Sequence, residues 1–235
     1  MRYNIPVPIF KKINKNFFKK WTFEMAYVLG FFAADGYITV NKRGGQFWCI
    51  QITDKELLEN IKKVIEAEHK ISIRLPDKNK PNENIIYRLQ IGSIEMCDDL
   101  QKLGFSERKT KSLAIPNVPK KYFQDFVRGY FDGDGSIWMG KIHKERKTKH
   151  DVLKLTFTSC SYEFIKKLHI ELSLFGIEGG CIYKPKNKQF CRLQFSTFNA
   201  LKLYDFMYNR SIKDFNGLYL QRKKIIFEKF KKLRP

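Results

Sequence analysis

The sequence of this 235-residue chain contains no long apolar run and no export signal. About 18 or more consecutive uncharged apolar residues would be needed for an ordinary transmembrane helix, and no such stretch occurs. The N-terminal residues also lack the apolar segment and the small-residue cleavage site of a secretion signal. We therefore expect an intracellular protein, in the cytoplasm or in an organelle if it is encoded there, and not a secreted one.

Cysteine is scarce and follows no pattern. The five cysteines are odd in number, no two form a C-x-x-C pair, and only four histidines could serve as further ligands. Reduced thiols are therefore favoured over disulfides or zinc sites.

Acidic residues are few relative to basic ones, with 24 Asp and Glu against 45 Lys and Arg and a formal net charge of +21. Self-repulsion of this size is typical of a protein with a polyanionic partner. The excess is concentrated at residues 141–150 and 222–235. Lysines on solvated faces of a protein from an AT-rich genome are the alternative. However, the cations alternate with Gln, Asn, Thr and aromatic residues, which suits a surface that lies along nucleic acid.

The most distinctive feature is a nine-residue segment that occurs twice, as VLGFFAADG at 28–36 and VRGYFDGDG at 127–135. Gly30 and Gly129 are separated by 99 positions, and so are Asp35 and Asp134. The repeat continues beyond the motif: Ile-Lys-Lys and Arg-Leu-Gln both recur at an offset of 104. The sequence therefore indicates two half-domains, with the extra residues of the second copy placed in the polar segment 141–150.

Periodicity predicts the same order of elements in both halves: helix, two strands, helix, two strands, helix. We predict an α+β fold of two pseudo-symmetric αββαββα repeats, each with a four-stranded antiparallel sheet, packed through the two motif helices. A basic arm (1–21) precedes the first half-domain (22–105), and a linker (106–121) precedes the second (122–235). In the first half the predicted elements are a helix from about 22 that Gly36 caps, strands at 37–41 and 46–53, a helix at 54–68, a strand at 87–91 and a helix at 93–103. In the second half they are a helix at 123–133, strands at 136–139 and 152–158, a helix at 161–175, a hairpin at 181–196, a helix at 198–208 and a basic helix at 216–233.

Glycine and alanine leave one face of each motif helix without bulk, so the two helices can pack side by side. If they run parallel, Asp35 and Asp134 meet at the negative ends of their helix dipoles, which is unfavourable for an acid. Two carboxylates about 6 Å apart repel by roughly 3 kcal/mol at an effective dielectric near 20. A hard divalent cation such as Mg²⁺ would reverse that repulsion. Asp132 is a separate case, because its counterpart is Ala33 and no symmetric role is implied.

These features resemble the LAGLIDADG homing endonucleases in their single-chain form with two fused half-domains. The resemblance covers nearly the whole chain from about residue 21, and the second motif copy is the more specific one. It implies a saddle of two sheets lying in the DNA major groove. The motif helices then present one acid each at the centre of the target, and each active site cuts one strand to leave short 3′ overhangs.

By this resemblance Asp35 and Asp134 are the catalytic acids and metal ligands, together with the carbonyls of Ala34 and Gly133. The family's peripheral lysine falls on Lys109 and Lys223. A family polar position at the end of the second strand falls on Asp54 in one half and on Ser161 in the other. The expected cofactor is Mg²⁺, with Mn²⁺ substituting and Ca²⁺ supporting binding without cleavage. The expected partner is double-stranded DNA with a long, pseudo-palindromic or asymmetric target, bound by a monomer.

Sequence readout is expected from the polar face of the strands, because Arg, Gln and Thr match guanine, adenine and thymine edges. The candidates are Thr39, Asn41, Arg43, Gln46, Gln51, Arg88 and Gln90 in the first half, and Ser136, Trp138, Lys154, Thr156, Arg192 and Gln194 in the second. Lysines of the last hairpin are expected to contact phosphates, namely Lys184, Lys186 and Lys188.

Three other functions are open at this stage. An intron maturase would use the same scaffold to bind RNA, although retention of both acids argues against one that has lost cleavage. A transcription regulator would need a helix-turn-helix module, for which the tail after residue 208 is too short. An architectural RNA-binding protein would explain the charge but not the duplicated acids. No splicing signature flanks the chain, which disfavours an intein.

Overall fold

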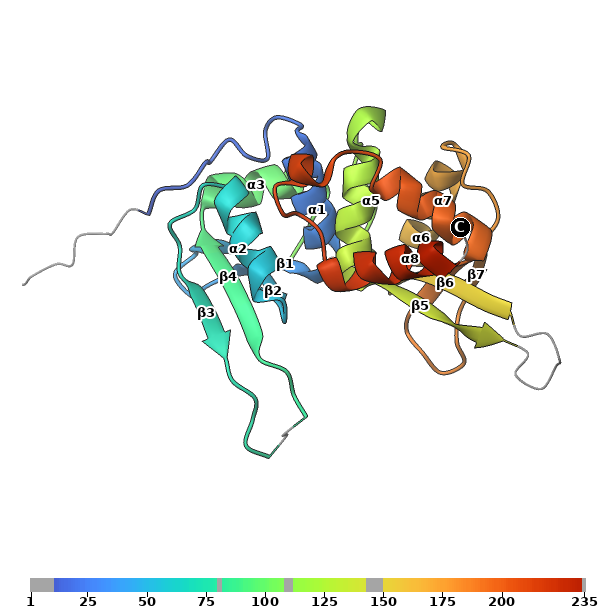
Figure 1. The fold of residues 1–235 in the computed structure, drawn as a ribbon. Coiled ribbons are helices and arrows are strands. Elements are labelled where there is room, and N and C mark those ends of the chain that lie inside the picture. The colour runs from blue at the N-terminus through green and yellow to red at the C-terminus, as the bar shows by residue number, and fades with distance from the viewer. Residues whose placement is uncertain (1–10, 80–81, 108–111, 143–149, 234–235) are drawn as a thin grey trace, which may run out of the picture.

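Two four-stranded antiparallel sheets carry the fold (Figure 1), in a computed structural model that describes residues 11–79, 82–107, 112–142 and 150–233. The strand order is β1-β2-β4-β3 in the first sheet and β5-β6-β8-β7 in the second. The predicted α+β class with two repeats is confirmed. The first half contains α1 (Phe23–Asp35), β1 (Gly36–Val40), β2 (Gln46–Ile52), α2 (Lys55–Val64), β3 (Ile71–Arg74), β4 (Ile86–Gly92) and α3 (Ile94–Lys102). The second contains α5 (Lys120–Asp134), β5 (Gly135–Ile142), β6 (His150–Ser159), α6 (Tyr162–Ser173), β7 (Cys181–Tyr183), β8 (Cys191–Ser196), α7 (Thr197–Met207), η1 (Ile212–Phe215) and α8 (Gln221–Leu233).

Side-chain caps fix the starts of four helices. Thr22, Asp54, Ser93 and Ser161 each accept a hydrogen bond from a backbone N–H in the first turn that follows. Such caps satisfy N–H groups that have no partner within the helix. The sequence therefore located these helix starts to within about one residue.

The prediction that Gly36 caps the first motif helix is confirmed, because its backbone N–H donates to the carbonyl of Phe32 at the end of α1. Its φ of −88° and ψ of 159° are extended, and β1 begins there directly. Glycine is needed at this position for space, because a β-carbon would lie 2.0 Å from the Phe32 ring.

The two motif helices pack in parallel at a distance that only glycine permits. A β-carbon at Gly30 would lie 2.0 Å from the carbonyl oxygen of Phe126, and one at Gly129 would lie 2.0 Å from that of Tyr27. The reciprocal contacts show that the motif helices are related by an approximate twofold axis. In Figure 1, α1 and α5 run side by side between the two sheets.

Alternation along the strands separates an apolar inner face from a polar outer face in both sheets. Trp48, Ile50, Leu89 and Ile91 are fully buried against the helices in the first sheet. Their outward neighbours in register include Cys49 with Gln90, and Gln51 with Arg88. In the second sheet, Leu155, Phe157, Leu193 and Phe195 have the inward role.

The chain returns to the first half after α7. Residues 208–220 cross over the motif helices, where Asn60 Nδ2 donates to the carbonyl of Gly217 at 3.1 Å and Asn216 Nδ2 donates to Glu24 at 2.9 Å. This crossing places the start of α8 beside the C-terminal end of α5 (Figure 1). Among the described residues, no helix combines the length and apolar character that a membrane crossing requires.

Candidate active site

The two motif acids terminate helices whose ends touch. Asp35 is the last residue of α1 and Asp134 the last residue of α5. A β-carbon at Gly133 would lie 2.3 Å from the β-carbon of Ala34 and 3.2 Å from Asp35 Oδ2. The Asp35 carboxylate therefore lies against the residue that immediately precedes Asp134. Asp35 is partly buried, whereas Asp134 is exposed.

A pocket of about 350 Å³ opens beside Asp35. Its lining includes Gln51 from β2, Gly133 from α5 and Arg222 from α8. Gln51 Nε2 donates to the hydroxyl of Tyr37 at 2.8 Å, which fixes both side chains at the pocket. Both motif helices therefore line the pocket, α1 through Asp35 and α5 through Gly133, and Arg222 adds a positive charge to the lining.

Asp54, which the resemblance offers as the family's polar residue in the first half, does not line the Asp35 pocket. Asp54 lines a separate pocket of about 220 Å³ between α2 and the 217–221 segment. Its carboxylate caps α2 by accepting from Leu57 N at 3.1 Å. Gln51, expected only to read bases, lies in the pocket with Asp35 instead. Ser161 likewise caps α6 and donates to the carbonyl of Leu113 at 2.8 Å.

Lys223 is buried at the C-terminal end of α5. Its Nζ donates to the carbonyl oxygens of Phe131, Asp132 and Gly135 at 2.5, 2.8 and 2.6 Å. These carbonyls lie at the C-terminal end of α5 and the start of β5, where a cation complements the helix dipole. Burial lowers the pKa of Lys223 to about 8, while the negative charges of Asp132, Asp35 and Asp134 oppose that change. Lys223, which the resemblance identifies as a peripheral lysine, thus also binds the carbonyls at the C-terminal end of the second motif helix. Lys109 lies outside the described residues.

Asp132 joins three elements at the same end of α5. Its Oδ2 accepts from the hydroxyl of Tyr27 on α1 at 2.7 Å and from the backbone N–H of Leu220 at 3.0 Å. The residue is 1% exposed, and burial raises the pKa of its carboxyl. Sequence comparison of the halves left Asp132 without a role because Ala33 is its counterpart. The structure shows that it holds the approach to α8, and therefore Lys223, against the motif helices.

A second buried polar group on α5 lies about two turns further from the acids than Asp132. Asp125 forms ion pairs with Arg128, at 2.8 Å, and with Arg210. Arg128 also donates to the carbonyls of Met207 and Leu218 and stacks over the ring of Phe215 at 4.1 Å. This network fastens residues 207–218 to α5. The counterparts on α1 are Ala26 and Leu29, so the polar core belongs to one half only.

The acid pair suits a hard divalent cation that is shared with a substrate. Within the described residues, no three His, Cys, Asp or Glu side chains gather closely enough to hold a metal alone. The carboxylates of Asp35 and Asp134 and the carbonyls of Ala34 and Gly133 are oxygen atoms of the kind that hard divalent cations bind, and such cations typically complete their coordination with water and phosphate oxygens. The residues present therefore fit a metal that binds together with a phosphate.

The predicted reading residues gather on the outer faces. In the second sheet, Ser136, Thr156 and Gln194 form one row across three strands, and Trp138 pairs with Lys154 in the next row. Trp138 is 48% exposed, and the ammonium of Lys154 lies 5.6 Å from its ring centroid. Arg192 shares this face and stacks on Phe190 at 4.9 Å. The three lysines expected to contact phosphates are exposed and lie in the β7–β8 loop, namely Lys184, Lys186 and Lys188.

In the first sheet, Thr39, Gln51, Arg88 and Gln90 lie on the outer face. The expectation for Gln46 is wrong, because its register places it on the inner side with Trp48. The β1–β2 turn holds Asn41 and Arg43, and the Asn41 Oδ1 accepts from the N–H groups of Arg43 and Gly45. Asn41 therefore shapes the turn that presents Arg43.

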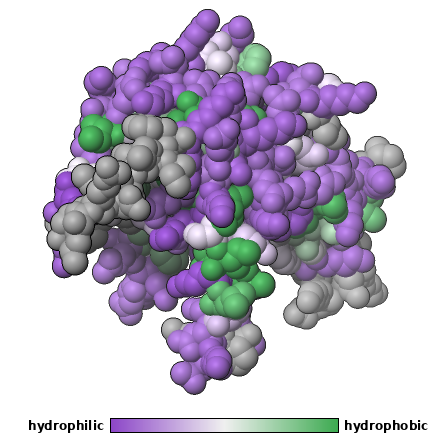
Figure 2. Space-filling model, turned by 90° about the vertical axis from the view of Figure 1, so that its left-hand side faces the viewer, coloured by the Kyte–Doolittle hydropathy of each residue, from purple (hydrophilic) through white to green (hydrophobic). Residues whose placement is uncertain are grey.

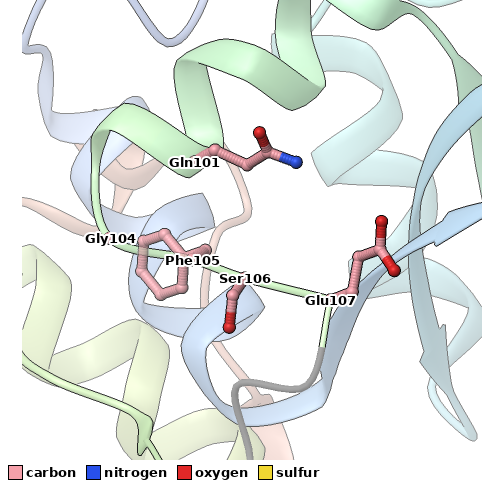
Figure 3. Close-up of a pocket in the computed structure, with 5 residues that line it drawn as sticks. All are labelled: Gln101, Gly104, Phe105, Ser106 and Glu107. Carbon is pink, nitrogen blue, oxygen red and sulfur yellow. The ribbon is translucent and has the colours of Figure 1, made fainter.

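Another pocket lies away from these residues. It measures about 630 Å³ at the end of α3, where Gln101 and Glu107 face a common space beside Phe105 (Figure 3). None of the predicted site residues lines it within the described part of the chain. The described residues that line this pocket include one acid, Glu107, and no cation.

Comparison with known proteins agrees with this geometry. The sequence profile of the LAGLIDADG-like domain matches residues 22–104 and 124–216, and the chain belongs to this family. The fold is similar to the homing endonuclease I-WcaI bound to its DNA recognition sequence, with 21% identity, a TM-score of 0.61 and 90% of both chains covered. It is also similar to I-AabMI bound to uncleaved DNA (15% identity, TM-score 0.57, 88% of this chain and 89% of that chain). A third similar structure is I-SmaMI bound to uncleaved DNA with calcium ions (14%, TM-score 0.53, 91% and 90%).

Two curated proteins are related in sequence. Uncharacterized protein MJ0398 of Methanocaldococcus jannaschii is 27% identical over 157 residues, which is 64% of this chain and 51% of that protein. The probable translation initiation factor IF-2 of Thermococcus kodakarensis is 34% identical over 74 residues, or 30% of this chain and 6% of that protein. The chain thus spans about half of one relative and a small part of the other.

Proposed function

We propose that this protein is a site-specific double-strand DNA endonuclease of the homing type, which hydrolyses one phosphodiester in each strand with Mg²⁺ and leaves short 3′ overhangs. One observation carries the proposal: two equivalent carboxylates, Asp35 and Asp134, lie at the touching ends of parallel helices between two sheets with polar outer faces. A binding module would not need acids at the unfavourable ends of two helix dipoles beside a polyanion.

The position of each group in the fold indicates its role in the proposed reaction. The outer strand faces hold the duplex, and the touching helix ends bring one carboxylate to each scissile phosphate. A divalent metal at these oxygens would supply charge neutralisation for the attacking and the leaving oxygen. Lys223 keeps the end of α5 fixed and adds positive charge next to the acids. Gln51 and Arg222 line the Asp35 pocket, where they can orient a phosphate or water.

The test uses supercoiled plasmid that carries the rejoined sequences flanking the reading frame in its genome. Linear product is expected with Mg²⁺ and none with EDTA, whereas Ca²⁺ supports binding without cutting. Asp35→Asn and Asp134→Asn are expected to abolish cutting and to leave binding largely intact. Asp205→Asn is a matched control, because the same chemical change there affects only an exposed ion pair with Lys231. Cutting that persists in both motif variants would exclude these acids as the catalytic groups.

A further inference from the structure

The described part of the N-terminal arm, residues 11–21, is docked on the first half-domain. Lys12 and Glu68 exchange two hydrogen bonds of 3.0 Å, from Lys12 N to the Glu68 carboxylate and from Glu68 N to the Lys12 carbonyl. Asn14 N donates to the carbonyl of Ile65 at 3.1 Å. Further along, Phe18 is 3% exposed and packs edge-on against Trp48 at 5.4 Å. The arm therefore has a defined place in the described structure.

Its position borders the polar outer face of the first sheet. Lys11 and Lys15 line a pocket of about 590 Å³ together with Phe47 and Gln90. Register places both Phe47 and Gln90 on the outer face, opposite the buried Trp48. The lysines thus continue the surface on which Gln90 and Arg88 lie. Figure 2 shows this end of the molecule, where hydrophilic side chains cover most of the surface.

The charge of the arm is one-sided. Residues 11–20 contain five lysines and no acid. Lys19 is neutralised by an ion pair with Glu95, whereas Lys11 and Lys15 form no ion pair within the described residues. Glu95 lines the same pocket and is already paired with Lys19, so Lys11 and Lys15 give this surface a net positive charge. Such a surface suits an anion such as a backbone phosphate.

We propose that the arm extends the DNA-binding surface beyond the strands, with Lys11 and Lys15 contacting phosphates of the duplex that lies along the outer face of the first sheet. The proposal rests on the proposed function for its ligand. It assigns these lysines to affinity and not to sequence readout, because phosphate contacts position a protein without reporting base identity. It also predicts a footprint that is longer on the side of the first half-domain than the strands alone would give.

The experiment compares Lys11→Gln/Lys15→Gln with the wild type in duplex binding between 50 and 200 mM salt, in Ca²⁺ so that no cutting is required. Loss of two phosphate contacts should reduce the slope of log K against log salt by about 1.8. Target and unrelated duplexes should be weakened by the same factor. The control is Lys166→Gln/Lys167→Gln, which makes the same charge change on the exposed face of α6.

The results separate the two proposals. A slope change in the arm variant that exceeds that of the α6 variant supports the arm interface, and protection lost at one flank in hydroxyl-radical footprinting locates it. Equal slopes for the two variants would overturn it while the proposed function stands. If the wild type shows no salt-dependent duplex binding, the proposed function fails and the arm interface fails with it. Unchanged thermal unfolding in both variants excludes misfolding as the cause.

Discussion

The carboxylate of Asp132 accepts a hydrogen bond of 2.7 Å from the hydroxyl of Tyr27, across the interface of the two motif helices. The same oxygen accepts from the backbone of Leu220, so one buried carboxylate ties α1, α5 and the start of α8 together. The first half has Ala33 at the equivalent position and no such tie. The two halves of the pseudo-symmetric site therefore differ in the contacts that hold the end of the motif helix.

Replacing Asp132 by Ala should impair cutting more than binding. The change leaves the Tyr27 hydroxyl and the Leu220 N–H without their partner, which costs about 1–3 kcal/mol, and it frees the segment that carries Lys223. A misplacement of about 1 Å can cost roughly 100-fold in rate, so we expect a loss of that order in plasmid cleavage. Affinity in Ca²⁺ should be unchanged. Asp132→Asn retains an acceptor oxygen and should recover most of the rate, and equal rates for all three proteins would show that Asp132 does not position the site.

Gly129→Ala should destabilise the protein strongly. The new methyl group would lie 2.0 Å from the carbonyl oxygen of Tyr27 and 2.8 Å from the amide nitrogen of Phe31, and both of these atoms belong to the backbone of the neighbouring helix. Overpacking of this kind costs about 1–3 kcal/mol or more in free energy of unfolding. Denaturant unfolding measures the loss. Gly45→Ala is the control, because the nearest atoms there belong to the flexible side chain of Asn41, and a comparable loss at Gly45 would contradict the interface argument.

Arg128→Met should also lower the free energy of unfolding, by about 3–5 kcal/mol, because the buried Asp125 then loses its buried partner and keeps only the partly exposed Arg210. Exposed ion pairs contribute about 0–1 kcal/mol, so Lys55→Met, which breaks the exposed pair with Glu59, should be nearly silent. Urea denaturation of the two variants gives the comparison directly. Similar small losses in both would mean that the Asp125 network is energetically unimportant.

His69 should make stability fall at mildly acidic pH. Burial lowers the pKa of His69 in the folded state, with Lys11 and Lys62 acting in the same direction. The folded protein thus favours the neutral ring. The contribution of His69 to the free energy of unfolding is complete above the unfolded pKa of about 6.5, and it is lost as the pH falls from that value through the lower folded pKa. The difference in free energy of unfolding between pH 7.5 and pH 5.5 should shrink in His69→Gln. The exposed His150 provides the control, and an unchanged pH difference in His69→Gln would refute the assignment.

Several features of the fold were accessible from sequence because their signals are local. Thr22 and Asp54 precede apolar periodic segments, and a side-chain cap acts within three residues. Alternation around Trp48 and Ile50 identified the inner face, since neighbouring strand residues point to opposite sides. Gln46 was misplaced by the same rule applied one residue out of register. The fourth strand of the first sheet, β3, was predicted without a residue range, because its four residues are mostly exposed and carry little pattern.

The sequence by itself determined that two equivalent acids end two equivalent helices, because the duplication is written in the chain and helix geometry is set by neighbouring residues. Only the tertiary structure decided which groups surround those acids. Lys223 reaches the carbonyls at the end of α5 from 88 to 92 positions away, and Gln51 meets Asp35 across a pocket. Such meetings depend on how the helices and sheets pack, and no spacing along the chain encodes the direction from which a distant side chain arrives.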